Sequence, residues 1–191
     1  MSQKIKTITV YASSCQQIAP VYFEAAEALG KLLAEQHITC INGGGYSGLM
    51  ATITETMIAN GGKVIGVLPQ FMIDKGWVHP NLSETVVTEN MHQRKQWMAD
   101  KSDACIALPG GAGTFDELME IIAWKQLELY RHPVVILNTN GYYERLLAML
   151  NHSKEEKFIP EEYDDLWSVA QTPQEALEII CSSFNEEKWK Y

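Results

Sequence analysis

The stretch Ala104–Glu117, ACIALPGGAGTFDE, passes from a short apolar run through a glycine-rich turn into a helix. The apolar run has the length of a buried strand, it breaks at Pro109-Gly110-Gly111, and we expect the helix to begin near Thr114. Glycines let a ligand contact the backbone, and the free N–H groups at a helix start favour an anion such as phosphate. Glu117 would lie about one turn into this helix, beside whatever the loop binds. The alternative is a plain strand-to-helix turn with Thr114 as its N-cap, and this stretch alone favours neither.

The overall composition limits the classes of partner. The 191 residues are 46% hydrophobic and 20% charged, which is ordinary for a globular chain with one core. A formal net charge of -9 and a pI near 5.0 argue against a nucleic-acid partner. A local anion pocket is still compatible with this charge, because Arg94 and Lys95 could supply the positive groups.

Cysteine usage and apolar runs indicate the compartment. Cys15, Cys40, Cys105 and Cys181 are scattered without a C-x-x-C pair, so we expect reduced cysteines in the core of a cytoplasmic protein. The first residues lead into a strand-like run rather than a signal peptide, and no apolar run is long enough to span a bilayer. We therefore expect no membrane partner.

Strand-like and helix-like segments alternate along the chain. Apolar, β-branched runs predict strands at 5–11, 38–41, 63–68, 85–88, 104–108 and 133–137. Caps and helical spacing predict helices at 20–35, 91–98, 114–129, 142–150 and 173–181, and a further helix from a second glycine loop, Asn42–Met50, to about 60. Segments 71–83 and 158–166 have no clean period, and the charged tail to 191 is expected to fray. This alternation predicts an α/β fold with a mostly parallel sheet, helices on both faces and a single domain over 1–191.

Several small-residue loops follow predicted strands. Ser13-Ser14, Gly43-Gly44-Gly45 and Pro109-Gly110-Gly111 each come directly after one. The carboxyl ends of parallel strands lie at one edge of a sheet, where such folds bind ligands. We therefore expect these three loops to converge on one site.

Other cofactor motifs are incomplete. The run Gly43–Gly48 formally matches G-x-G-x-x-G, but the next strand ends in Val67-Leu68-Pro69 without the acidic residue that a dinucleotide ribose requires. No G-K-[ST] follows a glycine loop, and no G-x-S-x-G marks a nucleophilic serine. No metal is predicted, because none of the histidines has ligand spacing: His37, His79, His92, His132 and His152.

Arg94 and Lys95 are the basic residues of greatest interest. They follow Asn90, the expected N-cap of a helix, and positive charges at a helix start oppose the helix dipole. They are either solvated on an exposed face or reach into an anion or nucleotide site. Met91 and Trp97 on the same helix are expected in the core or in a subunit contact.

Taken together, these segments resemble the LOG ("Lonely Guy") family of cytokinin riboside 5'-monophosphate phosphoribohydrolases, long mislabelled as lysine decarboxylases. The P-G-G-x-G-T-x-x-E motif with an upstream R-K pair is specific to it, whereas a G-G-G loop alone is not. The resemblance covers nearly the whole chain, in this order: Gly43–Gly45 with Gly48–Met50, Met91–Lys95, Pro109–Glu117, Trp124–Leu127, Pro133 and Asn140–Tyr143.

The resemblance implies hydrolysis of the N-glycosidic bond of a nucleoside 5'-monophosphate, AMP or an N6-prenylated AMP, to a free base and ribose 5-phosphate. It also implies a Rossmann-like homodimer with sites near the subunit interface and no metal or organic cofactor. The implied catalytic residues are Glu117, which would stabilise an oxocarbenium-like C1' and activate water, and Arg94, which would orient Glu117 or the nucleotide. The implied substrate-binding residues are Lys95, Gly110, Gly111, Ala112, Gly113, Thr114, Gly43, Gly44, Gly45, Ser14 and Met91.

This chain departs from the family pattern at three positions. Gly76 stands where many relatives have a substrate-contacting Glu, Ala123 where many have Thr, and Ala12 where the first turn usually has Gly. These departures leave the cleavage chemistry untouched but leave the preferred base open. Our hypothesis is a less polar base pocket, or one that is completed by residues such as Trp77.

Two other functions were weighed against this one. A non-catalytic nucleotide- or molybdenum-cofactor-binding carrier would need the phosphate loop but not the carboxylate of Glu117. Amino-acid decarboxylation has no support, because no lysine stands in an evident Schiff-base setting.

Overall fold

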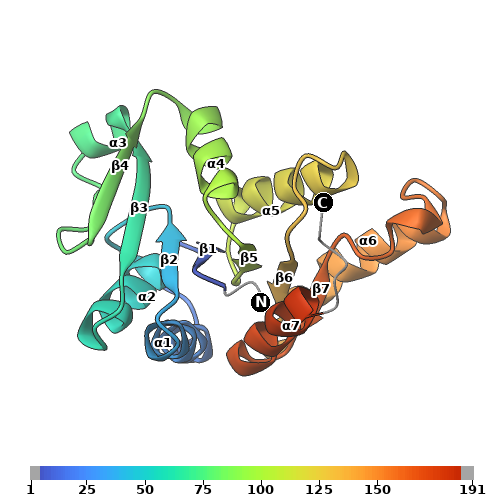
Figure 1. Cartoon of the computed structure of the whole chain (residues 1–191), viewed down its shortest axis with the longest axis horizontal. Coiled ribbons are helices and arrows are strands. Elements are labelled where there is room, and N and C mark those ends of the chain that lie inside the picture. The colour runs from blue at the N-terminus through green and yellow to red at the C-terminus, as the bar shows by residue number, and fades with distance from the viewer. Residues whose placement is uncertain (1–4, 186–191) are drawn as a thin grey trace.

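The computed structural model describes residues 5–185 of the chain, and the tail that was expected to fray falls mostly on residues 186–191, outside the described part. Within residues 5–185, strands and helices alternate around one sheet (Figure 1).

The sheet has seven strands, in the order β4-β3-β2-β1-β5-β6-β7, and each neighbouring pair is parallel. Successive strands are added on one side of β1 as far as β4, and the chain then crosses to β5 on the other side of β1. The switch point between β1 and β5 is where ligands bind in sheets of this type. The predicted α/β fold with a mostly parallel, Rossmann-like sheet is confirmed. The strands are β1 (Thr7–Tyr11), β2 (Thr39–Asn42), β3 (Val64–Pro69), β4 (Glu84–Thr88), β5 (Ala104–Ala107), β6 (Val134–Leu137) and β7 (Ser168–Ala170).

Helices cover both faces of the sheet (Figure 1). Helices α1, α2 and α7 pack on one face, while α4, α5 and part of α6 pack on the other. The helices are α1 (Pro20–Glu35), α2 (Gly48–Ala59), α3 (Gln70–Asp74), α4 (Met91–Asp100), α5 (Ala112–Gln126), α6 (Glu144–Glu155) and α7 (Pro173–Asn185), with short 3-10 turns η1 (Thr139–Gly141) and η2 (Glu161–Tyr163).

Strand β1 supplies both cores because its side chains alternate between the two faces. Ile8 and Val10 pack with α1, α2 and α7, whereas Tyr11 packs with α4 and α5. Thr9 faces the same way as Tyr11, and its hydroxyl donates to the Met98 carbonyl of α4 at 2.9 Å. Burial on both faces explains why the central strands are nearly continuous apolar runs in the sequence.

Helix α5, which follows the loop Pro109-Gly110-Gly111, begins earlier than predicted. Its first residue is Ala112 and its N-cap is Gly111, so Thr114 is a buried residue of the first turn and not the cap. The predicted N-cap at Thr114 is therefore wrong, and the choice between a plain turn and an anion site stays open at this point. Gly111 has no side chain to cap with, and the first N–H groups of α5 receive no side-chain cap from it.

Short elements account for most of the remaining differences. The segment 71–83 contains most of α3, which is five residues long without a buried residue, and β7 has three residues of which only Ala170 is buried. Neither is long enough to show a period. Helix α6 begins two residues later and runs five residues further than predicted, because its last turn is solvated and carries no apolar signal.

The cysteine prediction is correct for two positions and wrong for two. All four thiols are free, and Cys40 and Cys105 are buried as expected. Cys15 and Cys181 are exposed. Cys15 lies in the loop that leaves β1, and Cys181 follows the buried Ile180 on α7, so the helical turn carries it outward.

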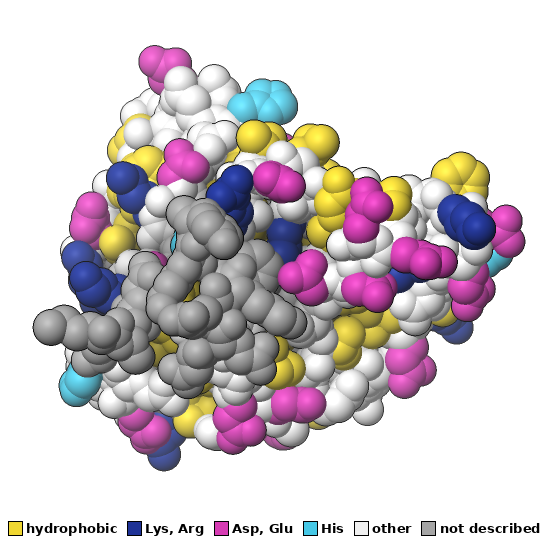
Figure 2. Space-filling model, turned by 45° about the vertical axis from the view of Figure 1, so that its right-hand side comes forward, with side chains coloured by type: hydrophobic (Ala, Val, Ile, Leu, Met, Phe, Trp, Pro, Cys, Tyr) yellow, Lys and Arg dark blue, Asp and Glu magenta, His cyan; other side chains and the backbone are white. Residues whose placement is uncertain are grey.

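The described surface mixes both signs of charge. Figure 2 shows acidic and basic side chains interspersed over the visible face, without a continuous basic area among the described residues on it. None of the helices in residues 5–185 is long and apolar enough to cross a membrane. The cytoplasmic location stays a prediction.

Tyr142 and Tyr143 hold the loop that follows β5. The Tyr143 hydroxyl, on a fully buried ring, donates to the Leu108 carbonyl at 2.6 Å, and the Tyr142 hydroxyl donates to the Gly110 carbonyl at 2.5 Å. The N–H of Tyr143 donates in turn to Asn138 Oδ1 at 2.7 Å. Because both phenols bind carbonyl oxygens, they fix the direction of the loop backbone immediately before α5.

Removal of the Tyr143 hydroxyl should cost more stability than removal of the Tyr142 hydroxyl. Tyr143→Phe deprives the buried Leu108 carbonyl of this donor, which should lower the free energy of unfolding by about 1–3 kcal/mol. Tyr142 is partly exposed, so water can replace its hydroxyl, and Tyr142→Phe should cost less than about 0.5 kcal/mol. Urea denaturation of the two matched variants measures the difference, and equal losses would contradict the argument from burial.

Candidate active site

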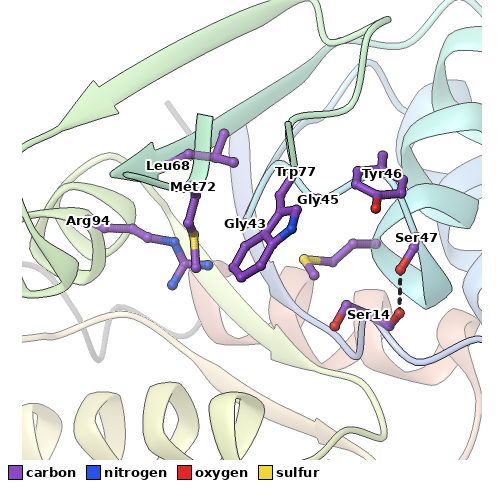
Figure 3. A pocket seen from close by; sticks show the side chains of 10 residues that line it. Ser14, Gly43, Gly45, Tyr46, Ser47, Leu68, Met72, Trp77 and Arg94 are labelled. Carbon is purple, nitrogen blue, oxygen red and sulfur yellow. Dashed lines mark hydrogen bonds between the residues drawn. The ribbon is translucent and has the colours of Figure 1, made fainter. Parts of the chain in front are cut away.

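Two of the three predicted loops line one cavity of about 280 Å³ at the carboxyl edge of the sheet. Ser14 from the loop after β1 and Gly43 and Gly45 from the loop after β2 lie around it together with Arg94 from α4 (Figure 3). The third loop joins the site through Glu117, which is bonded to Arg94. Glu117 lies on α5, after the third loop, and no residue of that loop lines the cavity, so the convergence is present for two loops and stays a prediction for the third.

The loop between β2 and α2 rests directly on the loop after β1. The Ser47 hydroxyl donates to the Ser14 carbonyl at 2.5 Å, as the dashed line in Figure 3 marks. Gly48 has a φ of +62°, and a Cβ there would lie 2.5–2.7 Å from the backbone of Ser13–Cys15. A side chain at this position would separate the two loops, so the glycine is required by both the backbone conformation and the close approach.

Arg94 crosses from α4 to the ends of two strands. Its Nε donates to the Val67 carbonyl of β3 at 2.9 Å, and its Nη1 donates to Glu117 Oε1 at 2.7 Å. The space beside Nη2 exists because Gly43 has no side chain, since a Cβ there would overlap Nη2 and lie 2.9 Å from the Met50 sulfur. The guanidinium is thus held by a carbonyl and a carboxylate, and it also borders the cavity.

Arg94 and Glu117 form a buried ion pair. Arg94 is 6% exposed and Glu117 is 8% exposed. Burial raises the pKa of Glu117 above its ordinary value, while the charge and hydrogen bond of Arg94 oppose that rise. Glu117 itself does not line the cavity, and it reaches the cavity wall through its bond to Arg94. A buried carboxyl whose pKa is shifted by burial and by one specific partner is typical of a functional site.

The start of α5 lies about one and a half turns before Glu117 on the same helix. None of the predicted binding residues of this segment lines the cavity, so their binding roles stay predictions: Gly110, Gly111, Ala112, Gly113 and Thr114. Thr114 packs on Gly110 so closely that a Cβ on Gly110 would overlap the threonine side chain. Gly111 and Gly113 have open space where a side chain would be. The N-terminal N–H groups of a 15-residue helix, without a side-chain cap from Gly111, form an arrangement suited to an anion.

Lys95 is directed away from the cavity. Its Nζ lies 3.0 Å from Asp116 and 3.1 Å from Glu120, both on α5, and it is not among the residues that line the cavity. Partial burial lowers the pKa of Lys95, but hydrogen bonds to these two carboxylates outweigh that effect and raise it. Lys95 therefore holds α4 against α5, and its expected role in substrate binding stays a prediction.

The other predicted binding residues are placed as follows. Met91 is the first residue of α4, behind the N-cap Asn90, whose side chain accepts from the Gln93 N–H at 2.9 Å. Gly44 has a φ of +68° and donates its N–H to Asn42 Oδ1 at 2.8 Å. Neither Met91 nor Gly44 lines the cavity, so their binding roles also stay predictions.

Sequence reasoning named only part of the cavity wall. Trp77 was anticipated and lines the cavity, but Tyr46, Ser47, Met50, Leu68 and Met72 also line it and were not singled out. Met50 belongs to the Gly48-Leu49-Met50 part of the second glycine motif, and this motif is the sequence signal that could have identified it. Met72 lies on α3, which had no readable period. In the described residues no group of three or more His, Cys, Asp or Glu side chains could hold a metal ion.

Comparison with known proteins identifies the family. The family model described as "Possible lysine decarboxylase" matches residues 50–180. A cytokinin riboside 5'-monophosphate phosphoribohydrolase of Arabidopsis thaliana is 40% identical over 156 residues, which are 82% of this chain and 72% of that protein. The chain belongs to the LOG family. A bacterial relative with the same name, from Rhodococcoides fascians, is 39% identical over 81% of this chain and 78% of its own length.

Solved structures share the fold with this LOG-family chain. The molybdenum cofactor binding protein of Rippkaea orientalis superposes with a TM-score of 0.72 over 95% of this chain and 99% of the other, at 23% sequence identity. The molybdenum cofactor carrier protein of Chlamydomonas reinhardtii gives a TM-score of 0.71 at 22% identity, over 96% of this chain and all of the other. At this level of identity the likeness concerns the fold alone.

The Arg94–Glu117 pair should dominate the stability of this part of the LOG fold. Arg94→Met leaves the Glu117 carboxylate buried without its partner, which should cost about 3–5 kcal/mol in the free energy of unfolding at neutral pH. Lys95→Met is the matched control on the same helix. Its partners are half-exposed or partly exposed, so water can solvate them and the cost should be about 1 kcal/mol or less. Chemical denaturation measures both, and a larger loss for Lys95→Met would contradict the ranking.

Proposed function

We propose that this chain hydrolyses the N-glycosidic bond of a nucleoside 5'-monophosphate and releases the free base and ribose 5-phosphate. The observation that carries the proposal is the buried Arg94–Glu117 pair, which connects an arginine that lines the cavity with a carboxylate in the second turn of α5. The names of the relatives, cytokinin riboside 5'-monophosphate phosphoribohydrolases from a plant and a bacterium, support the same reaction.

The phosphate would bind at the beginning of α5. The backbone N–H groups of Gly111–Thr114 and the positive end of the helix dipole suit a dianion. The tyrosine hydrogen bonds to the Leu108 and Gly110 carbonyls keep this backbone in place before the substrate arrives. Binding of the phosphate would fix the ribose relative to Glu117, which lies five residues along the helix from Ala112.

Glu117 would act on the anomeric carbon. As the bond between C1' and the base breaks, positive charge develops on C1' and the ring oxygen, and a carboxylate stabilises this charge. The same carboxylate would accept a proton from the attacking water, whose oxygen forms the new bond to C1'. The electron pair of the broken bond leaves with the base, which then takes up a proton.

Arg94 would keep the carboxylate ionised and oriented. Its Nη1 hydrogen bond fixes Oε1 of Glu117, and its positive charge opposes the rise in pKa that burial causes. Its Nη2 side, beside Gly43, borders the cavity and is available to polar groups of the nucleotide. One guanidinium thus would serve both the carboxylate and the substrate.

A homodimer is also part of the proposal. Apolar side chains on α5 and just beyond it are exposed in the single chain: Phe115, Met119, Leu127 and Leu129. Such side chains along one helix suit a subunit contact. The contact would place this exposed face of α5 against a second copy.

A nucleotide or molybdenum-cofactor carrier is the competing function. The solved structures with those titles support only the fold, and a carrier does not need a buried carboxylate beside its phosphate loop. The Arg94–Glu117 pair therefore favours the hydrolase, because burial of a carboxylate is costly and is retained where it performs chemistry.

Glu117→Gln should abolish turnover while nucleotide binding persists. The amide keeps the shape of the side chain but cannot accept the proton of water. Purified protein is incubated with AMP and with isopentenyladenosine 5'-monophosphate, without added metal, and base and ribose 5-phosphate are followed by chromatography. Near-normal turnover by Glu117→Gln would overturn the mechanism, and tight binding without any base release by the wild type would favour the carrier.

Arg94→Ala should lower kcat by orders of magnitude in the same assay, roughly 100-fold or more.

The pH dependence of kcat should carry the signature of Glu117. The carboxylate must be ionised to act, and burial raises its pKa above the ordinary value of 4.5. The rate should therefore fall, as the pH is lowered, at a higher pH than for an exposed glutamate. The negative charge of Asp116 contributes to the rise, so Asp116→Asn should move the acid limb to lower pH. Circular dichroism over the same range excludes acid unfolding, and an unmoved limb would contradict the assignment.

A further inference from the structure

Trp77 is an exposed tryptophan at the mouth of the cavity. Its side chain is 42% exposed, yet it lines the cavity together with Met50, Met72 and Leu68 (Figure 3). In Figure 3 its indole points into the space between Arg94 on one side and Tyr46 and Ser47 on the other. A large aromatic surface left partly open inside a concave site is suited to a planar ligand.

Gly76 determines the direction of Trp77. Helix α3 ends with the Gly76 N–H donating to the Ile73 carbonyl at 2.8 Å and the Trp77 N–H donating to the Met72 carbonyl at 3.0 Å. This is a Schellman cap, in which the residue after the helix adopts a left-handed conformation, and Gly76 has a φ of +71°. The cap commonly brings the following residue against the last helical turn, and here Trp77 and Met72 line the same cavity.

The backbone at Trp77 is bound to the second glycine loop. The Tyr46 N–H donates to the Trp77 carbonyl at 3.3 Å, and Gly45 and Val78 form an antiparallel bridge. The His79 N–H donates to the Gly44 carbonyl at 2.8 Å. The indole is therefore anchored at the base of its side chain by the same loop that forms the cavity floor.

One face of the indole is already covered. The Lys75 ammonium lies 4.8 Å from the centre of the Trp77 ring, a cation–π contact. Lys75 does not line the cavity. The lysine thus contacts the ring from outside the set of residues that line the cavity.

We propose that Trp77 is the surface on which the nucleobase of the substrate stacks, and that it determines base specificity. This inference rests on the proposed function, because the ribose must lie near Arg94 and Glu117 for the base to extend toward Trp77. Among the described residues that line the cavity there is no carboxylate and no histidine. The base would therefore be selected by the area and planarity of its rings more than by hydrogen bonds to its exocyclic groups.

This arrangement gives a reason for the glycine at position 76. Where many relatives have a glutamate that contacts substrate, a side chain in this chain would be strained by the left-handed backbone conformation. The glycine permits the cap, and Trp77, the residue that follows it, lines the cavity, whereas Gly76 itself does not. Substitution of Gly76 would disturb the cap as well as the pocket, so Trp77 is the residue to test.

The test compares a ligand that has a base with one that lacks it. In a Glu117→Gln background, where AMP is not consumed, calorimetry gives Kd values for AMP, UMP and ribose 5-phosphate. Trp77→Ala should weaken AMP binding roughly tenfold or more, which is the scale of one base–aromatic stack, with little change for ribose 5-phosphate. Trp77→Phe should retain most of the AMP affinity. The preference for AMP over UMP should shrink in Trp77→Ala.

Phe71 provides a matched control. It is a 44% exposed aromatic residue on α3 under the same lysine, with 5.8 Å between Lys75 Nζ and its ring centre, but it does not line the cavity. Phe71→Ala should change neither affinity. Tryptophan fluorescence adds a direct readout, because AMP should quench a component that is absent in Trp77→Phe, and ribose 5-phosphate should not.

The outcomes separate this inference from the proposed function. Equal losses for AMP and ribose 5-phosphate, or no loss for either, would overturn the stacking role even if the wild type releases base. AMP binding with quenching of Trp77 in a wild type that releases no base would support stacking and reject the hydrolase. If the wild type is active, Trp77→Ala should raise the KM for AMP while kcat stays within about threefold. A misfolded variant would instead lose both its affinity for AMP and its kcat.

Discussion

The site depends on one physical constraint, which is that Arg94 and Glu117 can be buried only together. Each is exposed by less than a tenth, and a single unpaired charge at that depth would be strongly unfavourable. The pairing requires that α4 and α5 lie side by side, that Val67 of β3 offers its carbonyl, and that Gly43 at the end of β2 offers space. A constraint shared by two helices and two strands fixes the carboxyl edge of the sheet around one guanidinium.

The glycines near this pair act through the space they leave and not through flexibility. The absence of a side chain at Gly43 leaves space for the guanidinium of Arg94. In the same way, Gly110 leaves space for Thr114, and Gly48 leaves space for the loop after β1. The contacts of Gly43 and Gly48 join segments far apart in the chain, so at these two glycines separate strand–helix units touch, whereas the contact of Gly110 with Thr114 is local. The tyrosines after β6 act in the same way from the other side, because their hydroxyls bind the loop backbone before α5.

The sequence alone predicted two kinds of feature: elements with a repeating apolar pattern, and loops that a parallel sheet brings to one edge. Apolar runs predicted six of the seven strands. Because parallel strands end at the same edge, the loops that follow strands were expected to converge, and two of the three line one cavity. The start of α5 was misplaced because Gly111 caps it without a side chain, and sequence patterns recognise caps by their side chains. The salt bridges of Lys95 could not be foreseen, since they depend on the rotation of α4 relative to α5. Helix α3 was missed because one turn has no period, although it carries Met72 into the cavity.

The elements that would carry reaction and specificity are different parts of the fold. The ion pair and the glycine loops belong to the central strand–helix units, where a change would disturb several packed segments at once. Trp77 belongs to the end of α3, a single exposed turn joined to the rest by a helix cap and a few backbone hydrogen bonds. A substitution there alters the wall of the cavity without altering Arg94 or Glu117. Because few contacts depend on α3, a change in this segment would leave the buried pair in place, so under the proposed function base recognition would be separable from the chemistry.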